Sequence, residues 1–305
     1  MKILLLGSRG MVGSSVSRIL NKNKSINLFA STRNDTNLFS LTETQKLFND
    51  FQPDIVINAA AKVGGILANN LQRSEFILSN LKININIIES ITEFPETKLI
   101  NLGSSCIYPL GAEVPISESS LMSGKLEPTN SPYAMAKLTA IEMGDAISKQ
   151  YGHKVLDLMP TNLYGPNDNF SENESHVIPG LISRMHRAKI ENKDKFEVWG
   201  TGKPLREFLY VDDLASAIEF TIDNDINPGL YNIGSNEEVT IKSLVDNVNN
   251  IIKFPGEIIF DDTKPDGNPR KLLDSSKFSS FGWKPAVDLS KGLKTTYDWY
   301  LNNIG

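Results

Sequence analysis

Short unbroken runs of apolar residues recur along the chain and are separated by segments with the apolar spacing of amphipathic helices. Runs of this kind are typical of strands that are buried on both faces of a parallel sheet. The predicted strands are residues 3–6, 26–30, 54–58, 98–102 and 155–159, and the predicted helices between them include residues 14–20, 78–91 and 131–149. This alternation predicts an α/β fold with a Rossmann-type, doubly wound parallel sheet.

The pattern becomes less regular after residue 160. It predicts a helix over residues 178–189 and strands over 196–199, 206–210 and 229–233, of which the last two could rejoin the sheet. We therefore expect residues 1–162 to form a dinucleotide-binding domain that is rejoined by about 205–234. Residues 163–204 and 235–305 should form mainly a smaller α/β lobe that binds substrate.

The length and net charge of the chain limit the kinds of protein it can be and the partners it can bind. A chain of 305 residues can bury a full core and two lobes. The net charge of −5 gives no basic field, so a nucleic-acid partner is not expected. The apolar start is too short for a signal peptide or a membrane span. Cys106 is the only cysteine, which excludes an internal disulfide and fits a cytoplasmic protein. We expect neither a membrane partner nor a metal site.

Three glycines follow the first predicted strand. Gly7, Gly10 and Gly13 form a G-x-x-G-x-x-G pattern that opens the first helix. The pattern alone is a weak signal, but this position between strand and helix is the context of a dinucleotide site. Glycines let the backbone approach a pyrophosphate, and the helix N-terminus offers N–H groups to it. The alternative is a tight turn that binds nothing.

The end of the second predicted strand bears on the choice of cofactor. An acidic residue about 20 positions after the glycines would bind the ribose hydroxyls of NAD. This chain has Arg33 in that region, and Arg9 lies inside the glycine loop. Two guanidinium groups can hold a 2′-phosphate, which favours NADPH over NADH. The alternative is that both arginines are solvated surface residues.

Tyr133 and Lys137 are candidate catalytic residues. Their spacing of four places both side chains on one helix face, and Ser131 and Pro132 are suited to the N-cap and first turn of that helix. A free phenol has a pKa of about 10, which a neighbouring ammonium should lower. Ser104 ends the preceding strand and could hydrogen-bond the same carbonyl oxygen as the phenol. This combination predicts a site that reduces a carbonyl group.

The glycine loop, Ser104 and the Tyr133–Lys137 pair together resemble the extended short-chain dehydrogenase/reductase family. The resemblance covers essentially the whole chain. Further motifs that carry it are residues 58–66, 103–109, 126–134, 161–166, 175–179, 206–208 and 264–273. It is closest to members that epimerise and then reduce GDP-4-keto-6-deoxy-D-mannose, which yields GDP-L-fucose. The resemblance therefore implies NADPH-dependent epimerisation at C3 and C5 and reduction at C4 of a GDP-4-keto-6-deoxy sugar.

The resemblance also implies catalytic roles. Cys106 would be the base and His176 the acid of epimerisation, next to the carbonyl that acidifies the C3 and C5 protons. Thiols and imidazoles ordinarily titrate near pKa 8.5 and 6.5, close enough to neutrality to exchange protons. Considered alone, either residue is more often structural. Ser104 and Tyr133 would hydrogen-bond the C4 oxygen, and Lys137 would hold the phenol and the nicotinamide ribose.

The binding residues implied by the resemblance form two sets. The cofactor set is Gly7, Ser8, Arg9, Gly10, Met11, Val12, Gly13, Arg33, Ala59, Ala60, Leu102, Gly103, Tyr133, Lys137, Pro160, Thr161, Asn162, Leu163 and His176. The substrate set is Ser104, Arg184, Trp199, Arg206, Asp266 and Lys271. Cations suit the charge of GDP, and Trp199 offers an apolar plane.

Two alternatives stay open. The chain could reduce a GDP-4-keto-6-deoxy-heptose at C4, with or without epimerisation. It could also be a sensor or scaffold that binds NADPH without catalysis, although the intact Ser104, Tyr133 and Lys137 set argues against this. The resemblance further implies a homodimer that pairs through the helices at 78–91 and 131–149.

Overall fold

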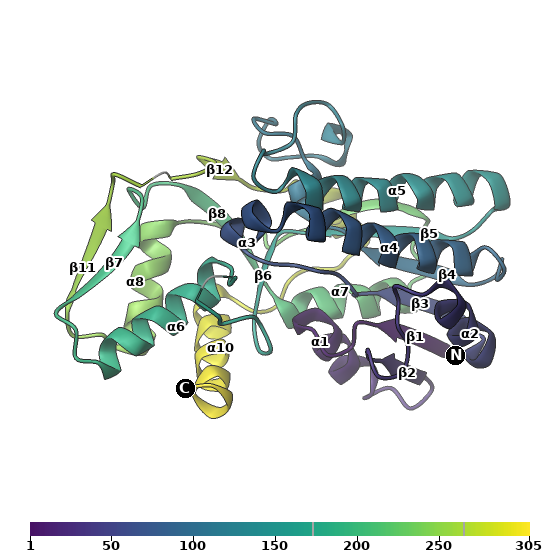
Figure 1. The fold of residues 1–305 in the computed structure, drawn as a ribbon, viewed down its shortest axis with the longest axis horizontal. Helices are drawn as coiled ribbons and strands as arrows, with labels where there is room; N and C mark the ends of the chain where they lie inside the picture. Colours follow the sequence, from purple (N-terminus) through teal and green to yellow (C-terminus); the bar gives the residue numbers. More distant parts are fainter. Residues whose placement is uncertain (173, 265) are drawn as a thin grey trace.

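A parallel six-stranded sheet organises the larger part of the computed structural model, which describes residues 1–172, 174–264 and 266–305 (Figure 1). The strands lie in the order β2-β1-β3-β4-β5-β9, and each neighbouring pair is parallel. Their bounds are β1 (Lys2–Leu6), β2 (Asn27–Ser31), β3 (Ile55–Asn58), β4 (Lys98–Leu102), β5 (Val155–Pro160) and β9 (Gly229–Ile233). The predicted doubly wound α/β fold is confirmed.

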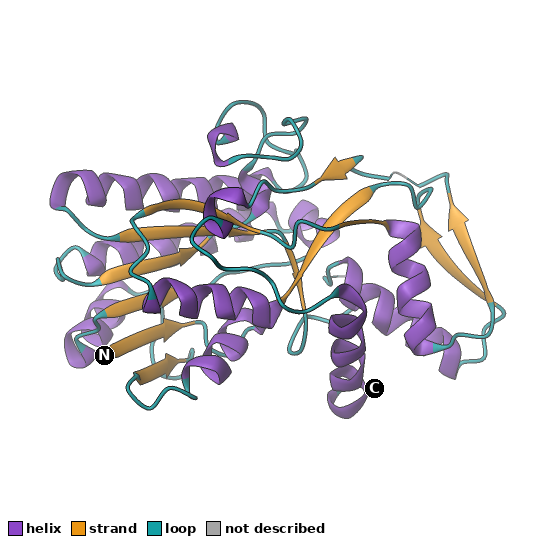
Figure 2. Cartoon of the chain, turned by 180° about the vertical axis from the view of Figure 1, so that it is seen from behind, coloured by secondary structure: helices purple, strands orange, loops and turns teal. Residues whose placement is uncertain are grey.

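Helices cover both faces of this sheet. On one face lie α2 (Leu41–Phe51), α4 (Arg73–Ile91) and α5 (Ser131–Tyr151), and on the other lie α1 (Met11–Leu20) and α7 (Val211–Asp223) (Figures 1 and 2). Ile3 and Leu5 pack with α1 and α7, whereas Leu4 and Leu6 pack with α2, α4 and α5. Because successive side chains of a strand point to opposite faces, a strand between two helical layers needs an unbroken apolar run.

The helix that carries Tyr133 begins at Ser131, as predicted, but a different residue caps it. Its N-cap is Asn130, so the prediction of Ser131 is wrong, although Pro132 does lie in the first turn. The Glu127 carboxylate accepts the N–H groups of Thr129 and Asn130 and fixes the turn before the helix. The Ser131 hydroxyl donates back to the Pro128 carbonyl instead of capping an N–H group.

A smaller lobe, on the left in Figure 1, contains two further sheets. Strands β6 (Asn162–Tyr164), β8 (Leu205–Tyr210), β10 (Glu238–Thr240) and β12 (Arg270–Lys271) form one, and β7 (Lys195–Trp199) and β11 (Glu257–Asp261) form the other. Its helices are α6 (Val177–Ile190), α8 (Ile241–Ile252) and α10 (Leu289–Asn303). The remaining short helices of the chain are α3 (Ile66–Leu71), η1 (Ser105–Ile107), η2 (Glu118–Ser120) and α9 (Ser276–Ser279).

Only one of the two strands expected to rejoin the main sheet does so. β9 pairs with β5, but β8 pairs with β6, β10 and β12 in the smaller lobe, so that expectation is wrong for residues 205–210. β8 carries Glu207, whose fully buried carboxylate accepts the N–H groups of Asn236 and Leu273. Both donors belong to segments of the smaller lobe. They supply the hydrogen bonds that a buried carboxylate needs, so β8 is held in that lobe.

Within the described ranges, no helix is both long and apolar enough to pass through a bilayer. Asn173 and Pro265 lie outside those ranges, and Pro265 falls within the 264–273 motif.

Candidate active site

The loop between β1 and α1 brings backbone N–H groups to the carboxyl edge of the main sheet. Gly7 has φ +80°, and a Cβ there would lie 2.7 Å from the Ala60 backbone. A Cβ on Gly13 would lie 2.2 Å from the Gly7 carbonyl oxygen, so only glycine fits either position. No side chain caps α1 at Gly10, which leaves its first N–H groups available to an anion. The loop therefore fits the pyrophosphate of a dinucleotide.

The glycine loop is tied to the end of β2. The buried Ser8 hydroxyl donates to the carbonyls of Ala30 and Ser31, at 3.1 and 2.8 Å. Arg9 and Arg33 are exposed on the two segments joined in this way. Sequence reasoning missed Asp35, whose carboxylate accepts the Thr32 N–H at 2.8 Å and hydroxyl at 2.6 Å. These bonds lower the Asp35 pKa, with a smaller contribution from Arg9, and they close the turn that presents Arg33.

The other residues predicted to contact cofactor follow the carboxyl ends of neighbouring strands. They are Met11 and Val12 at the start of α1, Ala59 and Ala60 after β3, Leu102 and Gly103 at the end of β4, and Pro160, Thr161, Asn162 and Leu163 from the end of β5 into β6. Since the strands are parallel, these segments meet at one edge of the sheet, where open α/β sheets bind ligands.

Three of the predicted catalytic side chains come together beyond β4. Ser104 precedes η1, and its hydroxyl accepts the Cys106 N–H at 3.3 Å. Tyr133, in the first turn of α5, lies close enough to Ser104 and Cys106 for both side chains to act on its ionisation. Its ring meets the ring of Phe76 edge-on, with the centroids 6.3 Å apart. The arrangement leaves the phenol beside a hydroxyl and a thiol.

The phenol of Tyr133 is harder to ionise than the sequence suggested. Burial raises its pKa above the ordinary value, Cys106 adds to the increase, and the Ser104 hydrogen bond opposes it. The expectation that Lys137 lowers the pKa of Tyr133 is therefore wrong. The Lys137 Nζ lies 5.9 Å from the Tyr133 ring centroid and donates to the Leu102 carbonyl at 2.6 Å. Tyr133 thus stays protonated at neutral pH, as a proton donor must.

Lys137 is a buried ammonium. Only 3% of its surface is exposed, and desolvation lowers its pKa to about 8, which the charge of Asp157 opposes. Sequence reasoning treated Asp157 as part of an apolar strand. A charged residue in the middle of a fully buried strand was the signal that could have singled it out.

Cys106 lies beside a cation that comes from a distant part of the sequence. The Lys271 Nζ lies 3.8 Å from the Cys106 Sγ. Lys271 lies on β12 beside Arg206 of β8, and the adjoining segment is fixed because Ile116 donates its N–H to the Leu272 carbonyl at 2.8 Å. Lys271, predicted to bind substrate, thus lies beside the Cys106 side chain.

His176 lies immediately before α6 on a segment that is fastened to the main domain. The Gly65 N–H donates to the Glu174 carbonyl at 2.8 Å, and a Cβ on Gly65 would lie 2.3 Å from the Ser175 carbonyl oxygen. The imidazole keeps an accessible surface, while desolvation by the surrounding protein lowers its pKa below the ordinary value. The contact brings the His176 segment to the loop after β3, near the cofactor edge.

The other residues predicted to bind substrate lie across the smaller lobe. The Arg184 guanidinium stacks on Phe196, 5.4 Å from the ring centroid, and Trp199 is 66% exposed. Both Asp266 carboxylate oxygens accept hydrogen bonds from Thr201, at 2.6 and 2.8 Å, which fixes the turn after Trp199. Arg206 is half-buried and electrostatically coupled to Asp266. The cations and the aromatic plane therefore share one lobe.

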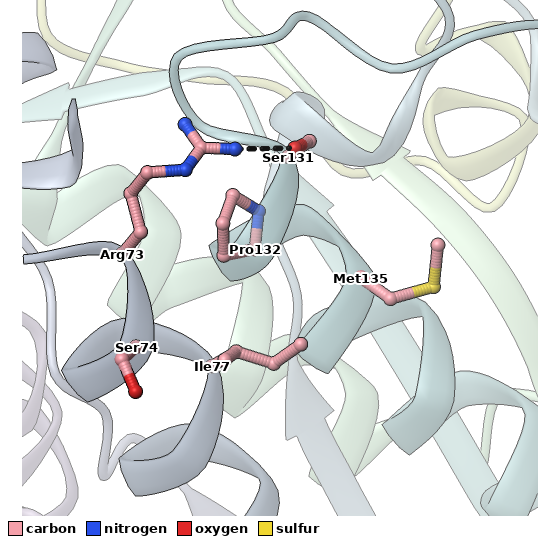
Figure 3. A pocket seen from close by; sticks show the side chains of 6 residues that line it. All are labelled: Arg73, Ser74, Ile77, Ser131, Pro132 and Met135. Carbon is pink, nitrogen blue, oxygen red and sulfur yellow. Dashed lines mark hydrogen bonds between the residues drawn. The ribbon is translucent and has the colours of Figure 1, made fainter.

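A groove of about 420 Å³ lies on the outer surface of α4 and α5, away from these side chains (Figure 3). It is lined by Arg73, Ser74, Ile77, Ser131, Pro132 and Met135. Arg73 donates to the Ser131 hydroxyl at 3.3 Å across the junction of the two helices. Among the described residues, no group of three His, Cys, Asp or Glu side chains is placed to hold a metal ion.

Residues 3–234 match the model of the NAD dependent epimerase/dehydratase family. This chain belongs to that family. GDP-L-fucose synthase 1 of Arabidopsis thaliana is 49% identical over 99% of this chain and 94% of its own. The resemblance inferred from the motifs is thereby confirmed.

Solved structures of family members agree in fold. A C. jejuni GDP-6-OMe-4-keto-L-xylo-heptose reductase superposes with TM-score 0.91 at 32% identity, covering 99% of this chain and 97% of that one. A GDP-L-fucose synthetase from Naegleria fowleri bound to NADP gives TM-score 0.89 at 29% identity, covering 99% and 94%.

Proposed function

We propose that this chain is an NADPH-dependent enzyme that epimerises GDP-4-keto-6-deoxy-D-mannose at C3 and C5 and reduces it at C4 to GDP-L-fucose. The observation that carries the proposal is the cluster of Ser104, Cys106 and Tyr133 at the edge of the sheet that holds the glycine loop. The 49% identity to a plant GDP-L-fucose synthase supports the same substrate.

Epimerisation requires a base and an acid near the carbons that flank the ketone. The Cys106 thiolate, stabilised by the Lys271 ammonium at 3.8 Å, takes a proton from carbon. Meanwhile the Ser104 hydroxyl and the Tyr133 phenol donate hydrogen bonds to the C4 oxygen, which carries the developing enolate charge. His176, on the segment fastened to Gly65, returns a proton from the other face.

Reduction uses the same oxygen contacts. Bound NADPH supplies hydride to C4. Tyr133, kept protonated by burial, gives its proton to the oxygen as alkoxide charge develops. Lys137 holds its ammonium beside the phenol and the nicotinamide ribose, anchored by the Leu102 carbonyl.

Product analysis tests the proposal directly. Incubation with GDP-4-keto-6-deoxy-D-mannose and NADPH should give GDP-L-fucose, with NMR showing inverted configuration at C3 and C5 and a new hydroxyl at C4. Binding of NADPH without turnover of any GDP-linked ketone would favour the sensor instead.

The structural likeness to a heptose reductase supports a second candidate. The chain would then reduce a GDP-4-keto-6-deoxy-heptose at C4. Separate incubation with hexose and heptose ketones distinguishes the two, because the preferred substrate should have the higher kcat/KM.

Arg33→Ala is expected to raise KM for NADPH by roughly 10- to 100-fold and to leave KM for NADH within about twofold. The variant lacks the exposed Arg33 guanidinium and therefore loses a charge-assisted contact to the 2′-phosphate, which only NADPH carries. Steady-state kinetics with both cofactors measure this. Equal changes in the two KM values would contradict the assignment. Arg18→Ala, in the last turn of α1, is the control.

Lys271→Met is expected to slow alkylation of Cys106 by iodoacetamide at pH 7 by roughly tenfold, because the thiolate loses its neighbouring cation. Cys106 is the only cysteine, so the reaction reports one site. The control is Lys264→Met, a nearby lysine whose Nζ lies over the Trp199 ring. An unchanged alkylation rate would remove Lys271 from this role.

We also propose a homodimer formed through α4 and α5. Leu78 and Ile85 of α4 and Met135 of α5 are exposed large apolar side chains, and Met135 lines the groove of Figure 3. A second copy of the chain would cover them. Sedimentation at micromolar concentration should show a dimer, and Met135→Glu should shift it toward monomer.

We further propose a division of the chain into two functional domains and a cytoplasmic location of the protein. Residues 1–162, rejoined by α7 and β9, would bind cofactor, and the two later segments would bind the GDP-sugar. A cytoplasmic location would keep the catalytic thiol of Cys106 reduced.

A further inference from the structure

A row of buried polar side chains crosses three neighbouring strands of the main sheet. Asn58 on β3, Asn101 on β4 and Asp157 on β5 are at most 5% exposed. Asn58 donates to the Asn101 side chain at 3.0 Å and to Asn84 of α4 at 3.1 Å, and Asn101 donates to the Asp157 Oδ1 at 2.8 Å. Strands buried on both faces normally carry apolar side chains, so this row needs an explanation.

The row lies under the helix that carries Lys137. A Cβ on Gly144 of α5 would lie 3.7 Å from the Asp157 Oδ2. Lys137 is two turns earlier on the same face of α5. Its Nζ donates to the carbonyl of Leu102, the residue after Asn101. In the β4–β5 register Asn101 pairs with Asp157, so the carboxylate and the ammonium approach the same stretch of β4.

A buried carboxylate is costly unless a cation compensates it. Burial raises the pKa of Asp157 to about 7, which the Asn101 hydrogen bond and the Lys137 charge oppose. The other charge acting on Asp157 is Asp145 of α5, which has the same sign. Tyr133 lies one turn before Lys137, and its ionisation responds to Cys106. Among the described residues, Lys137 is the cation that acts on the ionisation of Asp157.

We propose that Asp157, held by Asn101, is the buried counter-charge that keeps Lys137 protonated and directed at the Leu102 carbonyl beside Tyr133. Asp157 is a positioning residue, since it acts on the reaction through Lys137. The effect of Asp157 on the protonation of Lys137 is independent of the proposed function, and only its effect on C4 reduction rests on that function. Removal of the carboxylate leaves the ammonium surrounded by neutral groups, so Lys137 loses its proton at lower pH.

Asp157→Asn tests this, because asparagine keeps the shape and the Oδ1 acceptor for Asn101 and removes only the charge. In protein with ¹³Cε-labelled lysine, the NMR titration of Lys137, assigned with Lys137→Met, should have its midpoint at about 8. In Asp157→Asn that midpoint should fall by about one pH unit. The alkaline limb of the pH profile for C4 reduction should shift in the same direction.

The control is Asp213→Asn on α7, an equally buried aspartate that accepts the N–H groups of Ala286 and Val287 away from the site. It should leave the Lys137 titration unchanged. Asp157→Ser, a second charge-free variant, replaces Asp157→Asn if that protein does not fold. An unshifted Lys137 midpoint in a folded variant overturns the proposal. A shifted midpoint in a protein that turns over no GDP-linked ketone upholds it and overturns the proposed function.

Discussion

Tyr133→Phe is expected to lower the rate of C4 reduction by roughly 10²- to 10⁴-fold, the usual contribution of a positioned proton donor. Burial keeps the phenol protonated, so the variant loses that proton and one hydrogen bond to the C4 oxygen. Exchange of the C3 and C5 protons in deuterated water should persist, because Cys106, Lys271 and Ser104 remain. Mass spectrometry measures deuterium uptake, and cofactor absorbance measures reduction.

Tyr108→Phe is the matched control for this experiment. Tyr108 is a buried tyrosine whose pKa is likewise raised, and its hydroxyl donates to the Asn232 side chain at 2.6 Å. The loss of that buried hydrogen bond should cost about 1 kcal/mol of stability and leave reduction intact. Normal reduction by Tyr133→Phe, or equal loss of reduction and exchange, would contradict the assignment.

Cys106→Ser is expected to lower deuterium exchange at C3 and C5 by roughly 10²- to 10⁴-fold. A serine hydroxyl has nearly the size of the thiol, but it does not ionise near neutrality, even with the Lys271 ammonium 3.8 Å from the sulfur position. Ser104 and Tyr133 stay in place, so binding of the GDP-ketone should change little. Exchange by NMR and binding by calorimetry measure the two effects.

The control for local packing is Ser105→Ala, a buried neighbour in the same short helical turn. It should retain exchange. Unimpaired exchange in Cys106→Ser would exclude the thiol as the base and leave His176 to be tested in that role.

Features set by neighbouring residues in the chain were predictable from the sequence. The unbroken apolar run of β1 and the glycines after it require a buried strand and a tight turn into a helix, and both are present. The spacing of Tyr133 and Lys137 likewise places them on one face of α5 whatever surrounds that helix.

Features that depend on distant partners were not predictable. Lys271 and Cys106 lie 165 residues apart in the chain, and no local pattern indicates that they meet. β8 has the composition of a strand, but the segments that satisfy Glu207 decide which sheet it joins. The pKa of Tyr133 is raised mainly by desolvation from the surrounding protein, which the spacing to Lys137 cannot reveal.

The contact between Lys271 and Cys106 also bears on how this chemistry can diversify. The groups proposed to serve the C4 oxygen all precede residue 140, whereas the proposed base is paired with a lysine near the other end of the sequence. In the proposed mechanism, the loss of this one ammonium would therefore impair epimerisation more than reduction at C4. A single substitution far from the glycine loop would then be a short route from an epimerising enzyme to a simple reductase.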